Sequence, residues 1–74
     1  MSPAVPTDLS GAAVAKALER GGFTHISTRG SHAKYRSGSR TVIVPLHRRL
    51  APGTLRSILR QADWTAQELA EHLT

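Results

Sequence analysis

Apolar residues recur at helical spacing near both ends of the chain and alternate with polar residues in its middle. The first segment predicts a helix over residues 10–20, with three apolar residues on one face: Val14, Ala17 and Leu18. Asp8 or Ser10 can cap its start. Gly21-Gly22 ends it, because glycine adopts the left-handed conformation at little cost.

The middle of the chain predicts three strands joined by tight turns. Residues 23–28 are rich in β-branched and aromatic residues, and Gly30 follows them as a turn. Residues 31–36 alternate, with Ser31, Ala33 and Tyr35 on one face and His32, Lys34 and Arg36 on the other. Ser37-Gly38-Ser39 indicates a hairpin. In the next strand, residues 40–46, the run Val42-Ile43-Val44 favours a central or well-covered position, and Pro45 ends the strand or places it at an edge.

The last third of the chain predicts two helices. Pro52 suits the first turn of one helix, whose apolar residues recur at i, i+3, i+4 and i+7: Leu55, Ile58, Leu59 and Ala62. Thr65 and Glu68 have the spacing of a capping box. It opens a short helix with one apolar stripe: Ala66, Leu69, Ala70 and Leu73.

This order, α-β-β-β-α with a short extra C-terminal helix, predicts one α+β domain over residues 9–74 behind a flexible arm at residues 1–8. We expect a three-stranded antiparallel sheet with both main helices on one face. The other face would stay open and carry His32, Lys34 and Arg36 together.

Charge is strongly segregated along the 74 residues, whose net charge is +5. Residues 20–62 hold nine of the ten Lys and Arg residues and none of the five acidic ones. This favours a polyanionic partner, most often nucleic acid, over a basic surface kept for solubility. There is no cysteine, no apolar run of membrane-spanning length and no signal-peptide pattern, so we expect a cytoplasmic protein that does not act at a membrane.

His32 is the main candidate for chemistry. A histidine beside Lys34 and Arg36 can move protons while the cations hold a phosphodiester. RNA supplies its own nucleophile, the 2′-hydroxyl, so neither a metal nor a cofactor is required. The simpler alternative is a polar strand residue that faces water. His47, followed by Arg48, could contact phosphate or assist proton transfer. The four histidines have no metal-ligand spacing, so we predict no metal site.

Four motifs in order resemble the HicA family, the toxins of HicAB toxin–antitoxin systems. They cover about residues 10–63: Leu18 to Gly22-Phe23, Gly30-Ser31-His32-Ala33-Lys34-Tyr35, Val42-Ile43-Val44-Pro45-Leu46-His47 and Pro52-Gly53-Thr54-Leu55-Arg56-Ser57-Ile58-Leu59. The resemblance implies a double-stranded-RNA-binding-domain-like fold and ribosome-independent cleavage of mRNA. It also implies that His32 is catalytic and that a HicB-type antitoxin is the partner, which alone would connect the toxin to operator DNA.

The sequence therefore predicts a metal-independent mRNA interferase in which His32 is general base or acid for attack by the 2′-hydroxyl. Seven residues are expected to contact RNA: Arg29, Gly30, Ser31, Lys34, Arg36, His47 and Arg48. The alternative hypothesis is a non-catalytic double-stranded-RNA-binding module. It would bind RNA in a salt-dependent way without cutting it.

Overall fold

The computed structural model describes residues 8–74, which form three helices and three strands. In chain order they are α1 (Gly11–Arg20), β1 (Thr24–Arg29), β2 (His32–Ser37), β3 (Arg40–Pro45), α2 (Pro52–Ala62) and α3 (Ala66–His72). The predicted order of elements is confirmed. Of the arm expected at residues 1–8, only Asp8 falls within the described residues. None of the three helices in this part of the chain is long and apolar enough to cross a membrane.

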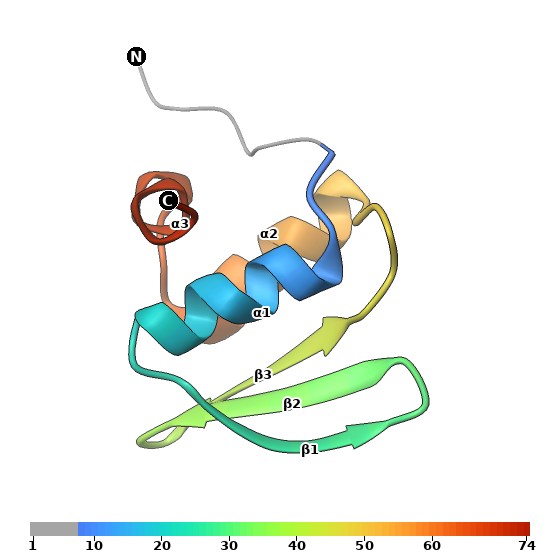
Figure 1. Ribbon diagram of the computed structural model, residues 1–74. Coiled ribbons are helices and arrows are strands. Elements are labelled where there is room, and N and C mark those ends of the chain that lie inside the picture. Colours follow the sequence, from blue (N-terminus) through green and yellow to red (C-terminus); the bar gives the residue numbers. More distant parts are fainter. Residues whose placement is uncertain (1–7) are drawn as a thin grey trace.

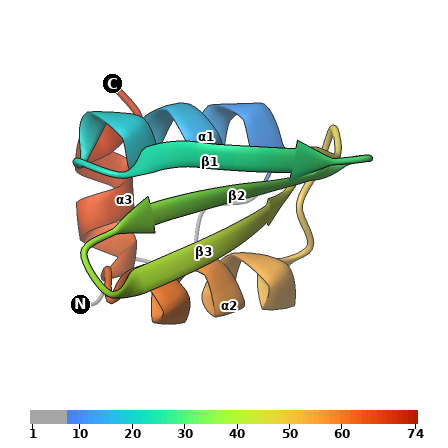
Figure 2. The ribbon, with the colours of Figure 1, turned by 90° about the horizontal axis from the view of Figure 1, so that it is seen from below.

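The strands form an antiparallel sheet in the order β1-β2-β3, and all three helices lie on one side of it (Figure 1). α1 packs across the three strands, α2 packs along β3, and α3 packs against α1. Seen from the other side, the face of the sheet carries none of the helices formed by residues 8–74 (Figure 2). The expected α+β fold with one open face is confirmed.

Local sequence explains where each helix begins. The side chain of Ser10 accepts a hydrogen bond from the Ala13 N–H at 3.1 Å, so Ser10 rather than Asp8 caps α1. Pro52 occupies the first turn of α2. Thr65 and Glu68 form the predicted capping box, with reciprocal hydrogen bonds of 2.9 and 3.1 Å.

The core lies between the helices and the inner face of the sheet. It contains the predicted faces of both main helices and the inward residues of β2 and β3: Val14, Ala17, Leu18, Ala33, Tyr35, Val42, Val44, Leu55, Ile58, Leu59 and Ala62. Leu69 of α3 is fully buried, but Ala70 is exposed, so the stripe predicted for the last helix is only partly correct. α3 has only seven residues and packs mainly against α1. It therefore buries a narrower strip of side chains than the four-residue apolar stripe in the sequence predicts.

β3 lies at an edge of the sheet and ends at Pro45, as that proline predicts. Of the two positions suggested by its apolar run, the central one is wrong and the well-covered one is confirmed, because α2 packs along the strand. Val42 and Val44 point inward and are fully buried, whereas Ile43 is 37% exposed. The N–H of Ile43 donates to Oε1 of Gln61 on α2 at 2.8 Å. α2 thus supplies a hydrogen-bond partner for one of the free N–H groups along the β3 edge. An apolar strand can occupy this edge of the sheet because α2 packs beside it.

Candidate functional site

Alternation along β2 places three polar side chains on the open face. Ala33 and Tyr35 are 2% and 6% exposed, while His32, Lys34 and Arg36 are all exposed. Burial of the first pair requires the second set to face outward, because successive side chains of a strand point to opposite faces. The predicted common face is therefore confirmed.

A bulge in β1 brings Arg29 beside His32. His25 pairs with Tyr35, but Ser27 rather than Ile26 pairs with Lys34, so the register shifts by one residue at Ile26. Without this shift, the side chains of β1 beyond Ile26 would take the opposite faces. With it, Arg29 pairs directly with His32. The extra residue thus adds a cation to the face that carries the histidine.

The turn between β1 and β2 fixes this pairing. Gly30 and Ser31 are its two central residues, and Gly30 has φ +57°, a conformation that residues with a Cβ rarely adopt. The backbone carbonyl of Ser31 accepts a hydrogen bond from the N–H of Leu46 at 2.6 Å. The turn is therefore joined to the segment that follows β3.

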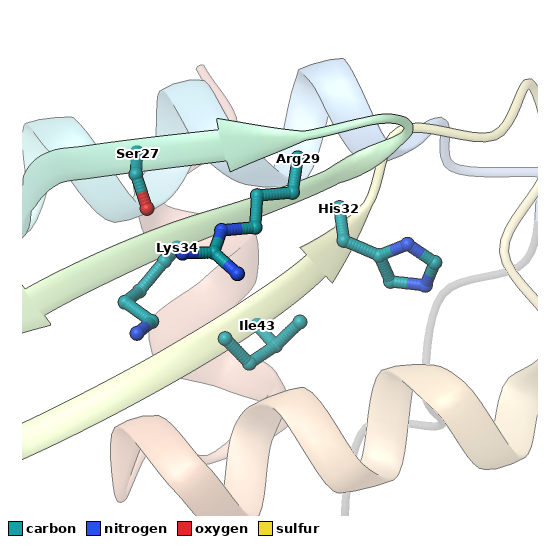
Figure 3. A pocket seen from close by; sticks show the side chains of 5 residues that line it. All are labelled: Ser27, Arg29, His32, Lys34 and Ile43. Carbon is teal, nitrogen blue, oxygen red and sulfur yellow. The ribbon is translucent and has the colours of Figure 1, made fainter.

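A pocket on the open face gathers residues from all three strands. It is lined by Ser27 and Arg29 of β1, His32 and Lys34 of β2, and Ile43 of β3. Figure 3 shows these side chains projecting from the same face of the sheet. Two cations and an imidazole thus surround a space whose lining contains no carboxylate, and such a site suits a phosphate group.

Arg36 does not join this pocket, although the alternation predicts the correct face for it. It pairs with Thr24 and Thr41, toward the opposite end of the sheet, and its Nε–H donates to the carbonyl of Gly38 at 3.0 Å. Of the three cations expected to hold phosphate, Arg29 and Lys34 line the pocket with His32, and only Arg36 lies away from it. The difference follows from the length of β2, since residues 32 and 36 are four positions apart along an extended strand.

His47 approaches His32 from the loop after β3. The centroids of the two rings lie 6.2 Å apart and the ring planes make an angle of 75°. Both side chains are exposed, and neither ring forms a hydrogen bond with any residue in the range 8–74. Arg48 follows in the same loop and is exposed. The two imidazole rings are therefore close enough for one ligand to contact both of them.

Cations near the pocket are largely free of internal partners. Across residues 8–74 the salt bridges are Arg40 with Asp63 at 3.1 Å and Arg49 with Asp8 at 3.0 Å. Arg29 and Lys34 take part in neither. In that same range, no three His, Cys, Asp or Glu side chains form a group that could hold a metal ion. The donors around the pocket therefore suit an anion.

Tyr35 lies on the buried side of β2, away from the pocket. Its burial, and secondarily the negative charge of Glu19, raise the pKa of the phenol above 10.0. The ring lies 5.3 Å from that of His25, measured between centroids. Tyr35 therefore acts as a core residue, as the alternation predicts, and does not reach the open face.

Two residues of the pocket were not predicted from the sequence. Ile43 could have been found, because it alternates with the buried Val42 and Val44 and must face outward. Ser27 could not, since its place on the open face depends on the bulge at Ile26.

A family model described as "HicA toxin of bacterial toxin-antitoxin" matches residues 11–64. This range runs from the first residue of α1 to two residues past α2, and it contains the whole pocket and His47. No curated protein matches the chain.

Proposed function

We propose that this chain, which belongs to the HicA toxin family of bacterial toxin–antitoxin systems, is an endoribonuclease that cleaves mRNA through His32. Membership of a toxin–antitoxin family implies a cognate antitoxin as partner. We infer that this antitoxin is of the HicB type and that the toxin reaches operator DNA only through it. The observation that carries the proposal is the position of His32 in a cationic pocket on the open face.

The pocket supports cleavage by the RNA's own 2′-hydroxyl. That oxygen attacks the adjacent phosphorus, the bond to the 5′-oxygen breaks, and a 2′,3′-cyclic phosphate and a free 5′-hydroxyl result. His32 transfers one of the two protons involved, a contribution that is typically about 10²–10⁴-fold. Arg29 and Lys34 stabilise the negative charge that grows on the phosphate oxygens.

The open face also explains how a long substrate could reach the site. His32, Arg29 and Lys34 are all exposed, and all three helices of the described part of the chain lie on the other side of the sheet (Figure 2). A single strand of RNA could lie across the sheet and place one phosphodiester in the pocket. We propose that no metal takes part, because the nucleophile, the proton carrier and the cations are all supplied by the RNA and the protein.

The test is cleavage of a long mRNA by the purified protein in EDTA. His32→Ala is compared with the wild type, and His25→Ala serves as the matched control. His25 is also an exposed strand histidine, but its Nε2 pairs with Oγ1 of Thr28 at 2.7 Å and it does not line the pocket. We expect the His32 variant to cut at least about 10²-fold more slowly and His25→Ala to cut at the wild-type rate.

Circular dichroism should show the same fold for all three proteins, because replacement of an exposed side chain usually changes stability by less than about 0.5 kcal/mol. Binding of RNA by the wild type without cleavage, in EDTA or with added Mg²⁺, would replace the proposal by the non-catalytic RNA-binding module. Cleavage that requires Mg²⁺ would refute the metal-independent mechanism.

A further inference from the structure

Cleavage by the 2′-hydroxyl needs two proton transfers. One group must take the proton of the attacking 2′-oxygen, and another must give a proton to the departing 5′-oxygen. A single imidazole does not perform both transfers efficiently in one step, because the two oxygens lie on opposite sides of phosphorus. His32 therefore needs a partner, and no carboxylate lines the pocket to act as one.

We propose that His47 is this second proton-transfer group, an inference that rests on the proposed ribonuclease function. The centroids of the His32 and His47 rings are 6.2 Å apart. Each transferring atom must approach its own oxygen to about 2.6–3.2 Å, so the two groups must stand several ångströms apart on either side of the phosphorus. The observed spacing allows one phosphodiester to contact both rings.

The backbone around His47 is held from two sides. The carbonyl of His47 accepts a hydrogen bond from the N–H of Gly11, at the start of α1, at 2.9 Å. The N–H of Leu50 donates to the carbonyl of Leu9 at 2.8 Å. On the other side, Leu46 is joined to Ser31, next to His32. The loop at residues 46–50 therefore has a fixed position relative to the pocket, as a group that acts with His32 requires.

The charges around the two rings favour an anionic ligand. Arg29 and Lys34 lie beside His32, and Arg48 follows His47 in the chain. Arg49 is neutralised by Asp8, the one acidic group bonded to this loop among residues 8–74. In the step itself one histidine gains the proton of the 2′-hydroxyl and the other loses its proton to the 5′-oxygen. Exchange with water then restores both rings.

The pH dependence of kcat/KM distinguishes proton transfer from a purely ionic or structural role. It would be measured with a short RNA that spans a mapped cleavage site, for the wild type, His47→Ala, His47→Arg and the control His25→Ala. We expect a bell-shaped profile for the wild type and the control. His47→Ala should be about 10²–10³-fold slower and should lack one limb of the bell. His47→Arg supplies a permanent positive charge that does not transfer protons, so it should not restore the rate.

The outcomes separate this inference from the proposed function. If the wild type does not cut RNA, or if His32→Ala cuts as well as the wild type, the ribonuclease proposal fails and the role of His47 fails with it. If His32→Ala is inactive while His47→Ala keeps its rate or both limbs, only the role of His47 is overturned. Recovery of activity in His47→Arg would likewise show that the side chain contributes charge alone.

Discussion

Gly11 is the point where the helical layer touches the loop of the candidate site, and its replacement by alanine tests that contact. A methyl group there would lie 2.8 Å from Cα of Leu46 and closer still to the carbonyl oxygen of Pro45. Both neighbours are backbone atoms, which cannot move aside as a flexible side chain would. Gly11→Ala should therefore push the start of α1 away from the loop and weaken the hydrogen bond to His47.

Two contributions lower the stability of the Gly11→Ala variant and a third partly offsets them. Crowding of a well-packed site costs about 1–3 kcal/mol, and loss of one backbone hydrogen bond costs about 0.5–1.5 kcal/mol. Alanine recovers about 0.4–1 kcal/mol by restricting the unfolded chain. The net destabilisation is roughly 1–3 kcal/mol, and a domain of 74 residues has a total stability of only about 4–11 kcal/mol. The expected fall in Tm is roughly 5–20 °C.

Thermal and urea unfolding followed by circular dichroism would measure this change. Gly53→Ala is the matched control, because a methyl group at that position in the first turn of α2 would have no atom of another part of residues 8–74 within 4 Å, apart from the backbone of its own helix. It should unfold at the wild-type temperature or slightly above it. A Gly11 variant as stable as this control would refute the close contact. If the loop also positions His47, RNA cleavage by the folded Gly11 variant should fall as well.

Two further predictions concern charge and pH. Arg29→Gln should reduce RNA cleavage and lower the slope of log K against log salt by about one unit, as measured by binding titrations at several salt concentrations. Arg36→Gln should have a smaller effect, because Arg36 lies toward the other end of the sheet. Equal losses in both variants would contradict the placement of Arg29, and not Arg36, at the phosphate. Because burial raises the pKa of Tyr35 above 10.0, the unfolded chain gives up this proton at lower pH than the folded one. The stability that Tyr35 contributes is then complete below about pH 10 and is lost as the pH rises above it. The urea midpoint of the wild type should therefore fall between about pH 9 and 11, and Tyr35→Phe should make this fall smaller. An equal fall in both proteins would contradict the role of Tyr35.

Most of the fold follows from local patterns. The helix caps, the i, i+3, i+4 spacing of α2 and the alternation of β2 each depend on neighbouring residues, so a sequence can show them directly. The same alternation predicts that His32 and Lys34 share the open face. The position of β3 does not follow from its composition, because Val42-Ile43-Val44 is satisfied equally by a central strand and by an edge strand that packs against a helix.

The composition of the pocket depends on features that are not local. The bulge at Ile26 decides which side chains of β1 face the open side, and nothing in the letters Thr24 to Arg29 marks that position. The approach of His47 to His32 depends on the hydrogen bonds that join the loop to α1 and to the β1–β2 turn. Hydrogen bonds between distant segments of the chain become visible only in three dimensions.

The two edges of the sheet also bear on how the protein behaves at high concentration. A small open sheet can recruit a strand from another molecule and begin to aggregate. Here Gln61 occupies an N–H of the β3 edge, and the irregular register at Ile26 distorts the β1 edge. Both devices make each edge a poor template for a further strand. The open face can thus stay free of helices while the edge strands resist pairing with strands of other molecules, which would lead to fibres.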